Sequence, residues 1–286
     1  MTGSFPIESA APCRHRGAPS EALVERVVGL LSDKLALDRA YLEKHGLAPE
    51  EYAQALPAAI EKLRGRMAAN NKRRRDFVEE VVNLLVDTGV ATHYQKPKYG
   101  DDTVYRLFLK EGIQVGLVQK GCPDGRHSSV AWSRPDWAQE LYLWWVCDSK
   151  TAEPGEHIWK GVTRVRGKIS TPGEDQLDGL IFFNRLCGTP DRPCPKMQHA
   201  VERNGVKLPP PCVYVFPHWE TNKSNLNWRG ETQRVFPALL LSAFGLSPVQ
   251  APYFIGHVGF RTSGATTTST EITSRYGIAK ASTARG

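Results

Sequence analysis

The stretch that most constrains this chain is ELYLWWVCDSK, residues 140–150. Its first eight residues are mostly apolar, rich in aromatic and branched side chains, and predict a buried β-strand. Buried strands normally end in turn residues, whereas this one runs directly into Asp148 and Lys150. Side chains two positions apart on a strand lie on one face, so an acid and a lysine would stand together at its end.

A second acid lies upstream, in CPDG at residues 122–125. We expect a strand to start at Asp124 and the segment 133–139, which contains Pro135, to turn the chain into the strand that begins at Glu140. In a simple antiparallel hairpin about this turn, Asp124 would face Asp148, with Cβ atoms about 4.5–5.5 Å apart. Lys150 would lie beside them on the same face.

Two carboxylates and a lysine suit the hydrolysis of a phosphodiester bond. Carboxylate oxygens bind Mg²⁺, which coordinates the phosphate and lowers the pKa of a bound water. An ammonium group can position that water and stabilise the charge that develops on phosphorus. The hairpin therefore predicts a magnesium site with Asp124 and Asp148 as ligands.

The pair CPDG and CDSK, with acids 24 residues apart, resembles the PD-(D/E)XK nuclease superfamily. The resemblance implies that Asp124 and Asp148 hold the metal and that Lys150 is the catalytic lysine. FVEEVVNLLVDTG, residues 77–89, also resembles the helix with which many of these nucleases begin their core and which supplies a further acid. Glu79 follows Asp76 at capping-box spacing, so we assign Glu80 to the site, with Glu79 as the alternative.

Other groups of acids and lysines in the sequence fit a nuclease site less well. Pro135-Asp136 falls within the predicted turn, and Pro190-Asp191 has no acid-x-lysine strand at a comparable distance. Asp175 and Asp178 with the later HWETNK form a rival set, but Lys223 lies three residues after Glu220 and would reach the wrong face of a strand. We interpret Asp175 and Asp178 as strand-entry residues. A solvated strand edge also remains an explanation for Asp148 and Lys150.

The order of periodic segments predicts an α/β fold with a mixed central sheet flanked by helices, after an N-terminal helical region. The resemblance implies that this core is of the restriction-endonuclease type. Helices are expected from Ser20 as N-cap, from Pro49 with a break or kink at Pro57, and from Asp76 to a C-cap at Gly89. Strands are expected within 91–97, 103–110, 113–120, 128–132, 141–147, 177–184 and 212–219, with a helix over 155–167.

This order divides the chain into four parts. Residues 1–19 are expected to form a flexible arm, 20–75 the helical region, 76–211 the catalytic core, and 212–286 the completion of the core together with a DNA-recognition region.

Composition indicates an ordinary globular protein, with 41% hydrophobic and 23% charged residues. No apolar run approaches the roughly 18 residues that cross a bilayer. The N-terminus lacks a secretory pattern, and six cysteines without a CxxC pair indicate a reduced, cytoplasmic protein. No GxxxxGK[ST] loop is present, so we expect no ATP-driven motor.

The net charge of +7 favours a polyanionic partner. From Cys212 onward, the sequence contains seven Lys and Arg residues and three Glu residues. Arg and Lys can read guanine and Asn can read adenine, so the polar stretch 221–234 predicts base contacts. The candidates are Lys223, Asn225, Asn227, Arg229 and Arg234, with Asn222 beside them and 260–270 as the next candidate segment.

Together these features predict a type II restriction endonuclease that uses Mg²⁺, binds double-stranded DNA and acts as a homodimer, because protein symmetry must match that of a palindromic site. A repair or junction nuclease on the same core is the enzymatic alternative. A non-catalytic DNA-binding protein, in which Asp124 and Asp148 are structural, is the alternative from another class.

Overall fold

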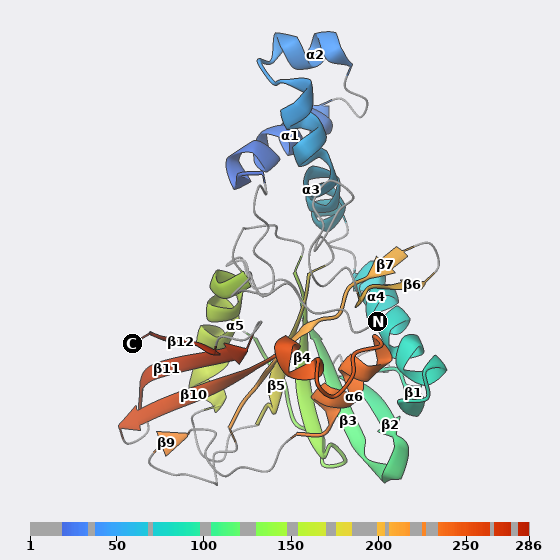
Figure 1. Ribbon diagram of the computed structural model, residues 1–286, viewed down its shortest axis with the longest axis vertical. Coiled ribbons are helices and arrows are strands. Elements are labelled where there is room, and N and C mark those ends of the chain that lie inside the picture. Colours follow the sequence, from blue (N-terminus) through green and yellow to red (C-terminus); the bar gives the residue numbers. More distant parts are fainter. Residues whose placement is uncertain are drawn as a thin grey trace.

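The structure is a computed structural model. It describes residues 19–33, 38–67, 71–97, 104–120, 130–147, 154–169, 176–184, 199–203, 206–217, 225–226, 234–263, 266–275 and 280–285. The described residues form an α/β protein in which a mixed sheet is flanked by helices and a group of N-terminal helices extends from one end (Figure 1).

Ten described strands make up the main sheet, in the order β1-β2-β3-β4-β5-β8-β10-β11-β12, with β9 paired to β10. The pairs β3–β4, β4–β5 and β8–β10 are parallel, and the other pairs are antiparallel. These strands are β1 (Ala91–Gln95), β2 (Val104–Leu109), β3 (Gln114–Lys120), β4 (Glu140–Cys147), β5 (Gly179–Asn184), β8 (Cys212–Val215), β9 (Asn225–Leu226), β10 (Ile255–Ser263), β11 (Thr266–Arg275) and β12 (Lys280–Arg285). A separate two-stranded sheet pairs β6 (Val201–Arg203) with β7 (Val206–Leu208).

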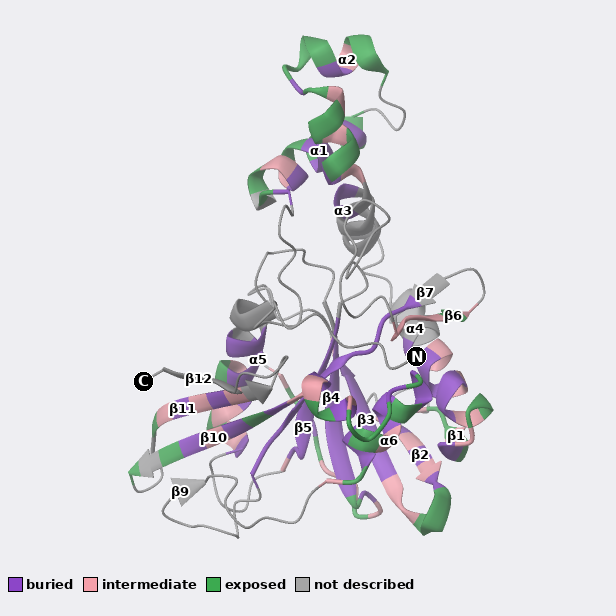
Figure 2. Cartoon of the chain, in the orientation of Figure 1, coloured by how far each residue is buried: buried purple, intermediate pink, exposed green. Residues whose placement is uncertain are grey.

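The central strand β4 is covered on both faces, as the continuous apolar run predicted. Trp144 and Trp145 are 0% and 1% exposed and lie in two different core clusters. The ring of Trp144 stacks with that of Phe183, and the ring of Trp145 stacks with that of Phe182. Each tryptophan therefore has an aromatic neighbour on the parallel strand β5. Figure 2 shows the resulting buried centre of the sheet.

Helices cover the two faces of this sheet. Side chains of α4 (Asn71–Asp87) and α6 (Phe236–Ala243) pack in the cluster that contains Trp144. Side chains of α5 (Pro154–Ile169) pack in the cluster that contains Trp145. The short helices η1 (Lys110–Gly112) and η3 (Ala251–Phe254) complete the elements around the sheet.

The N-terminal helices α1 (Glu21–Asp33), α2 (Arg39–Lys44) and α3 (Pro49–Met67) have a hydrophobic cluster of their own. Ser20 caps α1 as predicted, because its hydroxyl accepts a hydrogen bond of 3.1 Å from the Leu23 amide. The predicted start at Pro49 is confirmed. The helix does not break at Pro57: α3 continues through it, although proline offers no N–H to the helix.

Helix α4 begins at Asn71, five residues before the predicted start, and includes the basic run 72–75. Its end was predicted correctly, since Gly89 follows it with φ of +71°, a left-handed conformation that glycine adopts readily. Strands β1, β2, β3, β5 and β8 lie within the ranges predicted for them, whereas β4 begins one residue earlier and α5 extends one residue before and two residues after the predicted range. Strands β10 and β11 were not predicted: β11 is rich in Ser and Thr, and β10 has only a short apolar alternation at Val258 and Phe260.

Among the described residues, no helix is both long and apolar enough to cross a membrane.

Two glycines of α5 provide a test of how closely this helix packs on the sheet. A Cβ at Gly161 would lie 2.7 Å from Cζ of Phe182 and 3.0 Å from Cζ3 of Trp145, whereas one at Gly167 would meet no atom within 4 Å. We expect Gly161→Ala to lower the free energy of unfolding by about 1–3 kcal/mol through overpacking. Gly167→Ala should instead raise it by up to about 1 kcal/mol through helix propensity. Urea denaturation measures both, and equal effects would contradict the close packing of α5.

Candidate functional site

The carboxyl ends of β3 and β4 lie side by side at one edge of the sheet. The two strands are parallel neighbours, paired from Val115 with Glu140 to Lys120 with Trp145. Strand β5 is parallel to β4, and its pairing continues to Cys147 with Asn184, so it ends at the same edge. Crevices at the carboxyl ends of parallel strands are common ligand sites in α/β proteins.

The predicted antiparallel hairpin before β4 is wrong. Residues 130–135 are not a strand, and the neighbour of β4 is the parallel strand β3. A turn is present where it was predicted, closed by the Ala138 amide donating to the Pro135 carbonyl at 2.9 Å. Trp132 of this segment lies in the hydrophobic core and does not pair with β4. It is buried in the cluster with α5, and Lys168 lies over its ring.

The three central site residues, Asp124, Asp148 and Lys150, lie outside the described residues. Their positions in the chain relate them to the edge described above. Asp124 comes four residues after Lys120, and Asp148 comes three residues after Trp145, the residue that pairs with Lys120. In the sequence, both acids therefore follow directly on the two strand ends that meet at this edge.

Helix α4 places Glu79 beside the end of β1. Lys96, the first residue after β1, donates to the Glu79 carboxylate at 2.8 Å. Strand β1 runs in the direction of β3, because each is antiparallel to β2. Through Arg106 of β2, the register places Gln95, the last residue of β1, level with Gly116 of β3, four residues before β3 ends at Lys120. Glu79 therefore lies beside the end of β1, about 13 Å along the strands from the edge where β3 ends.

The neighbouring Glu80 accepts a hydrogen bond of 3.2 Å from Nε of Arg203, which also reaches Asp87 at 2.5 Å. These carboxylates raise the pKa of Arg203. The capping box used to choose between the two glutamates is wrong, because Asp76 lies inside α4 and not at its start. Glu79 and Glu80 are both half-buried, so burial does not distinguish the two glutamates.

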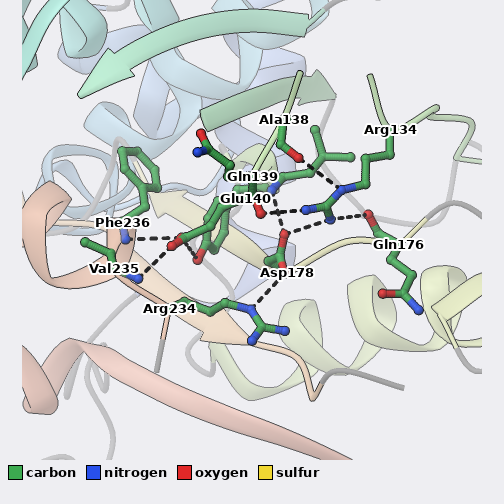
Figure 3. A network of polar contacts seen from close by, with 11 residues as sticks. Arg134, Ala138, Gln139, Glu140, Gln176, Asp178, Arg234, Val235 and Phe236 are labelled. Atoms are coloured by element: carbon green, nitrogen blue, oxygen red, sulfur yellow. Dashed lines mark hydrogen bonds and ion pairs between the residues drawn. The ribbon is translucent and has the colours of Figure 1, made fainter. Parts of the chain in front are cut away.

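A buried polar network lies at the opposite edge, where β4 and β5 begin (Figure 3). Asp178 is 4% exposed, and three donors converge on its carboxylate. They are Nη1 of Arg134 at 2.9 Å, Nε of Arg234 at 2.7 Å and the amide of Leu141 at 2.7 Å. The strand-entry role predicted for Asp178 is confirmed, and the network that it organises was not predicted.

Glu140 is the second acid of this network. Its carboxylate accepts hydrogen bonds from the amides of Val235 and Phe236, at 2.7 and 3.1 Å, and so satisfies the start of α6. The Tyr142 hydroxyl donates to the same carboxylate at 2.7 Å. Burial raises the pKa of Tyr142 well above its usual value, and the charges of Glu140 and Asp178 raise it further, so the hydroxyl keeps its proton.

Arg234, one of the residues predicted to contact DNA, belongs to this network. Its side chain is 10% exposed and pairs with Asp178, so we assign it a structural role instead of base contact. The sequence shows an acid, Asp178, directly before a predicted buried strand, and arginines that are far from it in the chain. Periodicity does not indicate which distant arginine such an acid binds.

Most other predicted DNA-contacting residues lie outside the described residues, namely Asn222, Lys223, Asn227 and Arg229. Asn225 opens β9, where it is paired with Arg261 of β10. Residues 225–226 of the first candidate recognition segment, 221–234, therefore pair with residues 260–261 of the second, 260–270.

Within the part of the chain that the structure describes, no group of three or more His, Cys, Asp or Glu residues is placed to hold a metal ion. Comparisons with protein-family models, with curated proteins and with solved structures find no match to this chain.

The Asp178 network predicts a large effect of removing its central charge. Asp178→Ala leaves two mostly buried arginines without their carboxylate, and breaking a buried pair in this way costs about 3–5 kcal/mol. The exposed Asp136→Ala is the matched control and should change stability by less than about 0.5 kcal/mol. Chemical denaturation measures both, and a stability loss at Asp178 no larger than that at Asp136 would show that the network is dispensable.

Proposed function

We propose that this protein is a Mg²⁺-dependent endonuclease that cuts double-stranded DNA at specific sites, as type II restriction endonucleases do. The observation that carries the proposal is the parallel pairing of β3 with β4. It brings together, at one edge of the sheet, the strand ends from which CPDG and CDSK follow. We also propose that the segment from α4 to β5 is a core of the restriction-endonuclease type.

Alternation along β4 supports a site on the face covered by α4. Tyr142 and Trp144 pack in the cluster that contains α4. If alternation continues past Cys147, Asp148 and Lys150 fall on this face as well. Glu79 and Glu80 belong to the helix that covers this face. An acid from α4 would then join the acids that follow β3 and β4.

The proposed chemistry divides the work among these residues. Asp124 and Asp148 would hold Mg²⁺, whose charge polarises the scissile phosphate and lowers the pKa of a bound water. Lys150 would orient that water and offset the negative charge that develops on phosphorus. The acid of α4, Glu80 or Glu79, would supply a further carboxylate near the metal.

Binding to DNA is supported by the net charge of +7 and by the surplus of positive charge after Cys212. Lys223, Asn225, Asn227 and Arg229 remain the proposed base-reading residues. A homodimer is proposed because a two-fold symmetric protein matches a palindromic site and can cut both strands.

One assay separates this function from its alternatives. Incubation of unmethylated plasmid with the protein and Mg²⁺ should give discrete bands. A smear would indicate a repair or junction nuclease or an exonuclease instead. DNA binding without cleavage would indicate a non-catalytic DNA-binding protein.

The catalytic assignment predicts that Asp124→Asn, Asp148→Asn and Lys150→Ala each abolish cleavage while DNA binding survives, because these groups serve the metal and the water. The asparagine variants could bind more tightly, since a negative charge near phosphate is removed. Asp136→Asn changes the acid of the other nearby Pro-Asp pair, at an exposed position, and should cut normally. Plasmid cleavage and gel-shift assays measure the two properties. Full cutting by any of the first three variants would remove that residue from the site.

The two glutamates of α4 can be distinguished by their need for metal. We expect Glu80→Ala to lower the cleavage rate and raise the Mg²⁺ concentration required, with the protein still folded. Glu79→Ala removes only the contact to Lys96 and should cut nearly normally. The measurement is a Mg²⁺ titration of the rate for both variants. The reverse pattern would transfer the role to Glu79.

A further inference from the structure

We infer that the ribbon formed by β10 and β11 is a surface for duplex DNA, separate from the edge at which β3 and β4 end. The inference rests on the proposed function in assigning DNA as the partner. It adds a location that the proposed cleavage chemistry does not require. Three observations about the ribbon carry it: its rigidity, its polar face and its charge.

The ribbon is rigid because one of its faces is buried. Val258 and Phe260 of β10 and Ile272 of β11 pack in the cluster that contains α5. The register places Val258 opposite Ile272 and Phe260 opposite Thr270, which is 2% exposed. Side chains of a strand alternate between faces, so the remaining positions lie on the face away from α5.

On that second face Ile255, at the start of β10, packs against the clusters that contain α4 and η3, but from His257 onward the described residues are small or polar. His257 and Arg261 are exposed and stand opposite Thr273 and Ser269 in the register. Gly259 opposite Glu271 fills the row between them. With no large apolar side chain among these positions, the face does not suit packing against another hydrophobic core. Hydroxyl groups and arginine are instead the donors that contact phosphate and base edges.

The charge of the segment suits a polyanion. Residues 255–285 contain four basic residues and one acid, a net charge of +3. Among the described residues, no ion pair involves the side chain of Arg261, which is exposed. Asn225 of β9 pairs with Arg261 from the other side, so the row Asn225, Arg261, Ser269 crosses three strands. This row joins the two segments that the sequence offered separately for base recognition.

The dimensions of the ribbon fit a groove of DNA. The major groove is about 12 Å wide and admits a two-stranded β-ribbon. Nine residues of β10 extend about 30 Å. That length is close to one turn of B-DNA, about 34–36 Å.

The ribbon lies at a distance from the proposed catalytic edge. Tyr142 of β4 is level with His257 of β10 through the register of β5 and β8. Cys147 lies five residues from this level in one direction, and Arg261 lies four residues from it in the other. At about 3.3 Å per residue the two are separated by about 30 Å along the strands. One duplex could therefore contact both surfaces about one helical turn apart.

The test is equilibrium binding of a fluorescent 40-base-pair duplex of mixed sequence, in metal-free buffer, followed by anisotropy over a range of salt concentrations. Arg261→Ala should weaken binding about tenfold at low salt and reduce the slope of log K against log salt by about 1. Ser263→Glu, which adds a negative charge at an exposed position near the end of β10, should also weaken binding. Arg39→Ala, at an arginine that is 81% exposed on α2, is the control and should bind like the unmodified protein.

Each outcome decides the inference. Unchanged binding of both ribbon variants overturns it, and so does equal weakening by Arg39→Ala, which would reflect net charge alone. If the unmodified protein does not bind the duplex, the inference and the proposed function both fail. If binding depends on Arg261 but Mg²⁺ produces no cleavage of any DNA, the inference stands and the proposed function fails. Thermal unfolding of each variant confirms that it is folded.

Discussion

The burial of β4 on both faces is the constraint on which the rest of this structure depends. A strand whose neighbouring side chains are both tryptophans needs an apolar cover on each side of the sheet, because a single exposed face would leave one indole in water. Helix α4 with α6 supplies one cover and α5 supplies the other. The parallel neighbours β3 and β5 follow from this arrangement, since parallel strands occur where both faces of a sheet are covered.

The polar groups are organised around the same strand. At its beginning, the Glu140 carboxylate accepts hydrogen bonds from the amides at the start of α6. Asp178, directly before the next strand, accepts hydrogen bonds from two arginines and from the Leu141 amide. These charges are buried but fully engaged, which is the condition under which a polar group can be kept in a protein interior. The network thereby ties α6 and the segment before β4 to the start of the sheet, and leaves the other end of β4 for the proposed chemistry.

Two separate parts of one sheet thus have different roles in the function that we propose. The carboxyl ends of β3 and β4 would supply metal ligands, and the ribbon of β10 and β11 would bind DNA about 30 Å away along the strands. The strands between them are hydrogen-bonded neighbours, so the spacing between the two surfaces is set by backbone pairing. A rigid spacing of this kind favours a fixed register on a periodic partner such as duplex DNA.

The sequence by itself determined the elements whose signals are local. Apolar runs located β4 and β5, Ser20 and Gly89 located helix ends, and the acid before β5 marked the start of that strand, because each depends on residues within a few positions of one another. Only the tertiary structure decided that β4 pairs with β3 and not with the segment before it. Trp132 of that segment packs in the core on the α5 side of the sheet and does not extend a hairpin. Likewise, Arg234 binds Asp178 and Asn225 pairs with Arg261 because packing brought distant segments together, and no pattern within either segment records its partner.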